Sequence, residues 1–151
     1  MLNMSTYDDE IRQALRTDFD GGSLIQAGDA SDVFRLLESA YPTCGSKIDW
    51  TRVSDAIECA DNEGFDRSKK FVEFFDEICN RLGLKGTVLY VGDSGTDFAL
   101  AASVETMRRV LPVLLEVPQH HYLVGPNARW CFCLTMEGYI DFGRSARPGL
   151  S

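Results

Sequence analysis

The chain lacks the features that mark a membrane or secreted protein. No stretch of its 151 residues approaches the roughly 20 consecutive apolar residues that span a bilayer. Its N-terminus reads MLNMSTYDDE, which is acidic and has none of the basic-then-apolar order of a secretory signal. These absences predict a cytoplasmic protein with no membrane partner.

Groups that bind metals or perform catalysis are also scarce. Five cysteines are present without a CxxC pair, and an odd, scattered set fits reduced thiols better than disulfides or a zinc site. The only two histidines, His120 and His121, are adjacent, so on one strand they point to opposite faces and do not share a metal ion. The sequence holds no glycine-rich phosphate cradle and no Ser/His/Asp or Cys/His constellation. It therefore predicts a protein that is not an enzyme, with no catalytic residues, cofactor or metal.

Positive charge is the third shortage. The formal net charge is −8, and it is uneven: residues 1–80 carry 8 Lys/Arg against 17 Asp/Glu, while residues 81–151 carry 7 against 6. Direct nucleic-acid binding needs a positive footprint that displaces counterions, so we do not expect it. A lopsided acidic surface suits a basic protein partner, although acidic charge also serves solubility alone.

Aromatic and β-branched residues gather near the C-terminus. Residues 119–143 read QHHYLVGPNARWCFCLTMEGYIDFG, in which Gly125-Pro126-Asn127 and Glu137-Gly138 separate three short strand-like runs. This pattern predicts a three-stranded antiparallel meander. The middle run alternates between a large apolar face and a smaller one, namely Trp130, Phe132 and Leu134 against Arg129, Cys131, Cys133 and Thr135.

A sheet with one aromatic face needs a cover, and the rest of the chain supplies helices. The strongest runs from Asp66 to Leu82, where apolar residues recur at offsets 0, 3, 4, 7, 8 and 11 from Phe71. The other predicted helices cover residues 6–16, 30–40, 49–60 and 103–115, the last with a kink or early stop at Pro112. Residues 87–92 read as a buried strand, and residues 18–29 as a loop that holds a short extended piece at Leu24-Ile25.

The expected fold class is therefore α+β in a single domain, residues 1–151. A helical N-terminal half packs on a small, mostly antiparallel sheet that ends in the three-stranded meander. The apolar content of 44% is sufficient for one core of this size.

Two aspartate motifs suggest an alternative. Asp18-Phe19-Asp20-Gly21 resembles the nucleophile loop of haloacid-dehalogenase-type (HAD-like) phosphatases, and Gly92-Asp93-Ser94-Gly95-Thr96-Asp97 resembles their magnesium loop. Such an enzyme would use an aspartyl nucleophile and a carboxylate-held magnesium ion. The first motif, however, follows the amphipathic segment IRQALRT instead of a buried strand, and the usual threonine is Gly22. The motifs are otherwise explained as two acidic turns.

The C-terminal runs carry a second resemblance. The residues from Tyr122 to Gly143, with Trp130 and the ending EGYIDFG, resemble the C-terminal hairpin of small immunity proteins from bacterial polymorphic-toxin systems. Contact-dependent growth inhibition modules are the nearest kind. The likeness covers residues 119–143 of the 151, and its residues are mainly structural. The helical first half adds nothing to it, so the class of toxin stays open.

This resemblance implies a partner and a mode of action. Such immunity proteins bind the C-terminal domain of a cognate toxin and cover its active site or substrate cleft, and many of those toxins are basic nucleases that act on tRNA. The candidate toxin-binding residues are loop carboxylates, namely Asp61, Glu63, Asp66, Asp93 and Asp97, with Asp18 and Asp20 next. Several of them are alternatively helix caps, and a non-catalytic adaptor domain of another kind shares every bulk property of the chain.

Overall fold

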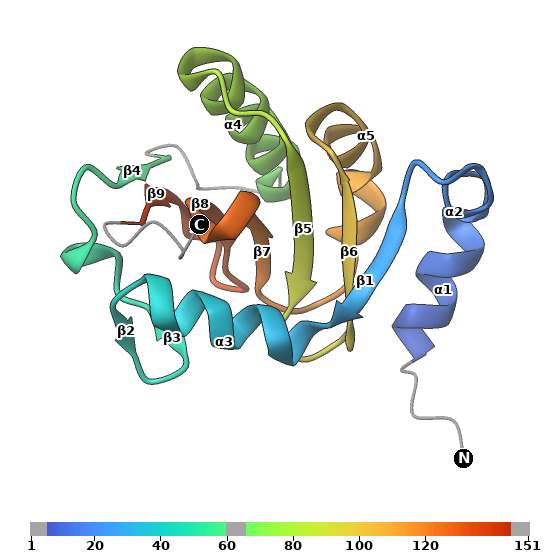
Figure 1. Ribbon diagram of the computed structural model, residues 1–151, viewed down its shortest axis with the longest axis horizontal. Coiled ribbons are helices and arrows are strands. Elements are labelled where there is room, and N and C mark those ends of the chain that lie inside the picture. Colours follow the sequence, from blue (N-terminus) through green and yellow to red (C-terminus); the bar gives the residue numbers. More distant parts are fainter. Residues whose placement is uncertain (1–5, 60–65, 146–151) are drawn as a thin grey trace.

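The computed structural model describes residues 6–59 and 66–145 (Figure 1). Within them the α-helices are α1 (Thr6–Ala14), α2 (Arg16–Gly21), α3 (Ala30–Ala40), α4 (Arg67–Leu82) and α5 (Val104–Leu114). The strands are β1 (Ile25–Asp29), β2 (Thr43–Cys44), β3 (Lys47–Ile48), β4 (Ile57–Glu58), β5 (Thr87–Gly92), β6 (Phe98–Ser103), β7 (His121–Val124), β8 (Trp130–Leu134) and β9 (Ile140–Arg144). No helix in these ranges is long and apolar enough to cross a membrane.

Seven strands form one sheet in the order β1-β6-β5-β7-β8-β9-β4, and each neighbouring pair is antiparallel. Strands β2 and β3 form a separate hairpin. The predicted α+β class, the antiparallel sheet and the C-terminal meander are confirmed. Strand β5, whose neighbours are distant in sequence, lies between β6 and β7 in the interior of the sheet.

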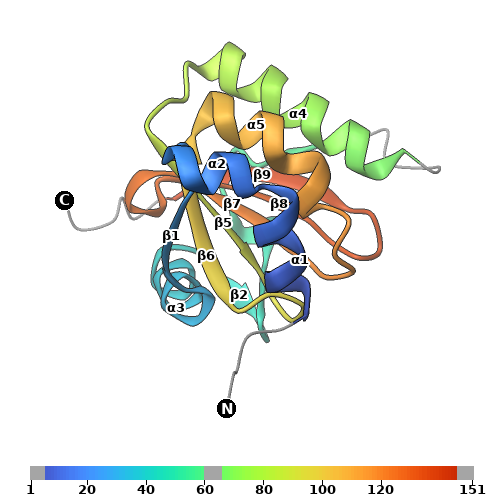
Figure 2. The ribbon, with the colours of Figure 1, turned by 90° about the vertical axis from the view of Figure 1, so that its right-hand side faces the viewer.

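The sheet is covered on both faces (Figure 2). One face packs against α1, α4 and α5, and it carries the large apolar side chains of β8 as the alternation predicts. The other packs against α3 and the β2–β3 hairpin, and it carries Cys131 and Cys133 with Tyr122. Two separate hydrophobic clusters result, one on each side of a single sheet.

Phe132 stands at the centre of the larger cluster. Three rings of α4 meet it edge-on, with ring centroids 6.5, 5.8 and 5.0 Å away for Phe71, Phe74 and Phe75. Helix α4 is thus amphipathic as predicted, and it ends at Gly83, whose φ of 66° is a left-handed conformation that favours glycine. Its aromatic stripe is core.

The prediction of a helix over residues 49–60 is wrong. Asp49 does accept a hydrogen bond from the Thr51 N–H at 3.2 Å, but only a single 3₁₀ turn, Trp50–Arg52, follows. Asp55 then adopts a φ of 59°, which interrupts any helix, and Ile57 pairs with Phe142 of β9. Pairing with β9 at the edge of the sheet therefore determines the conformation of this segment, although its apolar periodicity alone indicates a helix.

Two further elements differ from expectation. Residues 18–29 are predicted as a loop with a short extended piece at Leu24-Ile25, but α2 extends to Gly21 and the extended piece is a longer strand, β1 at Ile25–Asp29. Strand β6 lies where no element was predicted, because its sequence FALAAS is rich in alanine, which favours helix. Helix α5 continues past Pro112 and ends two residues later, at Leu114.

Two carboxylates lie opposite each other at the β4 edge. Asp141 of β9 is 7% exposed and pairs across the strands with Glu58. Burial, and secondarily the negative charge of Glu58, raises the pKa of Asp141 from 3.8 to about 6. The folded chain therefore binds a proton on this group in a pH range where the unfolded chain has released it.

We expect Asp141→Asn to change how stability depends on pH. In the wild type, this group lowers the free energy of unfolding as pH rises from about 4 to about 6, and the loss persists above. The variant lacks that loss, so relative to the wild type it gains about 1–2 kcal/mol between pH 5 and pH 7.5. Urea denaturation at the two pH values measures the difference. Identical pH profiles for the two proteins would contradict the raised pKa, and Glu58→Gln, which removes only the like charge, should show a smaller shift.

Candidate functional site

Several loops meet at one end of the sheet. The register pairs Gly92 with His121, His121 with Leu134, and Leu134 with Ile140, so the loops that flank these residues lie side by side. Strands β1 and β5 run in the same direction, which brings Asp29 to the same end (Figure 1). We call this surface the sheet-end face and define it as Asp29 with residues 93–97, 119–120 and 135–139.

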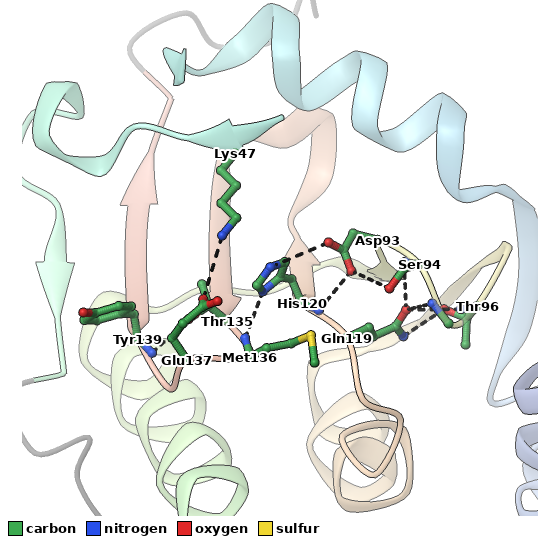
Figure 3. A network of polar contacts seen from close by, with 11 residues as sticks. Lys47, Asp93, Ser94, Thr96, Gln119, His120, Thr135, Met136, Glu137 and Tyr139 are labelled. Atoms are coloured by element: carbon green, nitrogen blue, oxygen red, sulfur yellow. Dashed lines mark hydrogen bonds and ion pairs between the residues drawn. The ribbon is translucent and has the colours of Figure 1, made fainter. Parts of the chain in front are cut away.

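Gln119 holds the loop of residues 93–97 in place (Figure 3). Its side-chain oxygen accepts three consecutive backbone N–H groups, from Ser94 at 3.2 Å, Gly95 at 2.7 Å and Thr96 at 3.1 Å. Its amide nitrogen donates to the hydroxyls of Tyr90 at 2.9 Å and Thr96 at 3.0 Å. The side chain is 2% exposed, so these bonds replace water entirely.

Glycine is required where this side chain approaches the backbone. A Cβ atom at Gly92 would lie 1.9 Å from the Gln119 Nε2 atom, and one at Gly95 would lie 2.6 Å from a methyl group of Val117. The glycines of the GDSG sequence therefore make room for a buried brace. The hydrogen bonds to Gln119 and the close packing hold this loop in its conformation.

The hydrogen bonds of Gln119 continue into the core through Tyr90 and His121. The Tyr90 hydroxyl lies 2.7 Å from Nδ1 of His121 and accepts from Gln119, so its own proton points at the histidine. Burial lowers the pKa of His121 to about 4, which keeps the ring neutral as an acceptor. Burial also raises the pKa of Tyr90, which keeps its hydroxyl protonated.

His120 joins the loop of residues 93–97 to the β8–β9 turn (Figure 3). Its backbone N–H donates to Asp93 Oδ1 at 3.0 Å, and its ring Nδ1 accepts the Met136 N–H at 2.9 Å. The proton of the neutral ring is then on Nε2, which lies 3.8 Å from Asp93 Oδ2. His120 and His121 serve opposite faces, and among residues 6–59 and 66–145 no group of three or more His, Cys, Asp or Glu side chains is placed to hold a metal ion.

A hollow of about 730 Å³ opens beside the loop of residues 93–97. Its charged lining consists of four carboxylates and one guanidinium, namely Asp8, Asp29, Asp93, Asp97 and Arg12. The Asp8 carboxylate accepts the Asp97 N–H at 3.2 Å, while the Asp29 and Asp97 side chains are exposed. The hollow is therefore acidic and open to solvent.

A second hollow, of about 200 Å³, adjoins the first and shares Asp93 and Phe34 with it. Phe34 meets Tyr122 edge-on at 5.3 Å between ring centroids, and Glu38 adds another carboxylate to the lining. Together the hollows form a surface that combines aromatic contact area with negative charge. Such a surface suits a basic partner better than an anionic ligand.

The structure brings together two of the predicted binding residues, Asp93 and Asp97. Asp66 precedes α4 as its N-cap residue, with no side-chain capping bond. Asp61 and Glu63 lie outside the described residues. Two residues of the site were missing from the sequence prediction: Asp29, and Gln119, whose partners lie about 25 residues earlier in the chain.

Asp18 and Asp20 lie elsewhere, on α2. Asp18 receives two hydrogen bonds from Arg109 of α5, at 2.6 and 3.1 Å, and one from the Ser23 hydroxyl at 2.9 Å. The bonds to Arg109 lower the pKa of the Asp18 carboxyl, so it stays ionised and ties α2 to α5. Asp20 is exposed near Arg16.

The two motifs that resemble a phosphatase are not adjacent. Asp18 precedes the start of β1, and Asp93 follows the end of β5, which runs in the same direction, so they lie at opposite ends of the sheet (Figure 1). Six residues of β5 alone span about 20 Å. The first motif is also helical, and the sheet is antiparallel where that enzyme family has a parallel one.

Comparisons with known proteins yield no relative. No protein-family model matches the chain, no curated protein matches it, and no solved structure matches its fold.

Proposed function

We propose that the chain is an immunity protein that binds and neutralises the C-terminal domain of a cognate toxin. In this proposal the toxin is a basic domain, a nuclease that acts on tRNA. It belongs to a contact-dependent growth inhibition system or a related polymorphic-toxin system. The observation that supports this most is the acidic hollow. Asp93 and the exposed Asp97 line it from the loop of residues 93–97, which Gln119 holds in place, and the exposed Asp29 lines it from the end of β1.

The proposed mode of action is competition for a substrate cleft. A nuclease that binds tRNA needs Lys and Arg side chains against the phosphate backbone. Carboxylates held at fixed positions offer those cations an alternative partner and so exclude the nucleic acid. The brace made by Gln119 favours tight binding, because a loop that is already ordered loses little entropy on association.

Two other properties agree with this proposal. The net charge of −8 repels nucleic acid and attracts a basic domain at long range. The five cysteines are free thiols, three of them buried, as suits a protein that meets the toxin in the reducing cytoplasm.

Co-expression tests the proposal directly. The partner to use is the C-terminal domain encoded by the gene immediately upstream of the gene for this chain. We expect rescue of growth and nanomolar, stoichiometric binding of the purified proteins. Persistent growth arrest together with no binding would refute the proposal, and magnesium-dependent phosphate release that Asp18→Asn abolishes would favour the phosphatase alternative.

Charge reversal on the sheet-end face is expected to slow association. In the double variant Asp29→Lys/Asp97→Lys, both changes affect exposed side chains and leave the Gln119 brace intact. We expect the association rate constant to fall about 10-fold or more at low salt, because steering by opposite charge is lost. The difference should shrink as ionic strength rises, which stopped-flow mixing over a salt series measures.

Asp20→Lys is the matched control, since it reverses an exposed carboxylate on α2, away from the sheet-end face. It should change the association rate much less per charge reversed. An equal or larger effect at Asp20 would place the binding surface at the α2 end of the molecule.

A further inference from the structure

The smaller of the two hollows has the volume of a side-chain pocket. It measures about 200 Å³, below the roughly 300–1,000 Å³ of sites that hold small molecules or cofactors. Its lining comes from α3, from the β2–β3 hairpin, from Asp93 after the end of β5 and from Tyr122 near the start of β7. A single side chain of a partner protein is therefore the class of ligand that fits it.

The inner wall of this hollow is apolar and aromatic. Leu37, Ile48 and Tyr122 line it and are buried. Phe34 is partly buried and meets the Tyr122 ring edge-on. Apolar side chains pack against the methylene groups of a long charged side chain, and an aromatic ring attracts a cation placed over its face. The wall therefore suits the stem and the charged end of a basic side chain.

Two exposed residues with carboxylates also line the hollow, Glu38 of α3 and Asp93, and we call them the rim carboxylates. The Glu38 carboxylate makes no hydrogen bond or ion pair with the part of the chain that the structure describes. Asp93 uses its Oδ1 atom, which accepts the His120 N–H at 3.0 Å and the Ser94 hydroxyl at 3.2 Å. Its Oδ2 atom lies 3.8 Å from the His120 Nε2 atom, too far for a hydrogen bond, and so keeps its capacity as an acceptor.

The cations of the neighbouring elements are paired elsewhere. Lys47 belongs to the hairpin that lines the hollow, but its Nζ atom lies 3.8 Å from the carboxylate of Glu137, toward which it points (Figure 3). Arg35 of α3 donates to Asp32 at 2.6 Å. Within the described segments no Lys or Arg nitrogen lies within ion-pair distance of either rim carboxylate. The hollow therefore keeps a negative charge that a partner can neutralise.

We infer that the smaller hollow is a receptor pocket for one arginine side chain. In the proposed function, on which this part rests, that arginine comes from the substrate cleft of the toxin. Arginine fits better than lysine because its planar guanidinium stacks on aromatic rings, gives up water more readily and binds a carboxylate through two parallel hydrogen bonds. An arginine held in this way is withdrawn from the phosphates that it would otherwise contact.

A titration with a small probe tests the pocket without any toxin. Nα-acetyl-arginine amide, added to the isotope-labelled chain, should cause saturable NMR shifts in the amides of residues 34–38, 46–48, 93 and 122. The citrulline analogue has nearly the same shape without the charge and should cause none, and the lysine analogue should bind more weakly. Glu38→Gln should weaken binding of the arginine probe about threefold. Absence of shifts with the arginine probe, or equal shifts with the citrulline or the lysine analogue, would overturn the arginine pocket.

The same substitution tests whether the toxin uses the pocket. Against the upstream-encoded domain, Glu38→Gln should raise Kd about 10-fold, because an interface excludes the water that screens the pair. Phe34→Leu, which keeps an apolar side chain but removes the ring, should raise it by a similar factor. Glu38 is exposed, so thermal unfolding of Glu38→Gln should remain near that of the wild type.

Glu73→Gln is the matched control, because it removes the same charge from an exposed position of α4, which covers the opposite face of the sheet. It should leave Kd nearly unchanged. If the wild type and both glutamine variants bind the domain equally well, the toxin does not use the pocket, and the proposed function stands. If the wild type does not bind the domain, the proposed function fails, and the probe titration still decides whether the pocket accepts arginine.

Discussion

Replacing Phe132 with alanine should lower the free energy of unfolding by about 4 kcal/mol, within the range measured for buried phenylalanines. Its side chain is fully buried, and its ring contacts those of α4 and also Trp130 at 5.7 Å and Phe142 at 4.6 Å between centroids. Because a domain of this kind has a total stability of about 5–15 kcal/mol, the variant should lose between about a quarter and four fifths of it.

Urea denaturation followed by circular dichroism measures this loss. Phe19→Ala is a control of the same chemistry, since Phe19 on α2 packs only partly buried against the same cluster. It should cost less than half as much. Equal losses at the two positions would show that Phe132 is not the centre of the core.

The second large effect is expected at Gln119. Leucine is similar in size but accepts no hydrogen bond, so Gln119→Leu leaves the N–H groups of residues 94–96 without their shared acceptor. An unsatisfied buried polar group costs about 1–3 kcal/mol, and we expect a total loss of about 3 kcal/mol or more. The amides of these three residues should also exchange with solvent much faster, which NMR hydrogen exchange measures without any partner.

Gln119→Glu tests the role of the accepting oxygen separately from that of the donating amide nitrogen, because it keeps the first and removes the second. A carboxylate still accepts the three N–H groups, so amide protection should largely survive, although burial of the charge destabilises the chain. Gln13→Leu, at an exposed position of α1, controls for the substitution itself and should change neither stability nor exchange. Unchanged protection of residues 94–96 in Gln119→Leu would mean that the loop is ordered by other contacts.

Local periodicity predicted the elements that have one strong amphipathic face. The apolar stripe of α4 and the alternation in β8 decide which side is buried, and both are visible in a short window of sequence. Strand β4 and strand β6 could not be recognised in that way. Their conformation depends on pairing with β9 in one case and with β1 and β5 in the other, and these partners are distant in sequence.

The candidate site was predictable to the same extent. Asp93 and Asp97 follow a recognisable strand, so a loop with two carboxylates could be expected there. Asp29 joins them only because β1 runs in the same direction as β5, which is a property of the whole sheet. The turn at Glu137-Gly138 was predicted correctly. The exposure of Met136 and Tyr139 on the same turn was not, because it depends on which residues of other elements pack against the turn.

The order of the strands also has a consequence for synthesis. Both edge strands of the large sheet, β1 and β4, come from the first 58 residues, whereas the five strands between them come from residues 87–144. At about 5–20 residues per second, the N-terminal segments leave the ribosome several seconds before the strands with which they pair. The nascent chain therefore spends that time with β1 and β4 unpaired: β1 can pair once β6 has been made, whereas β4 has to wait for β9, the last strand.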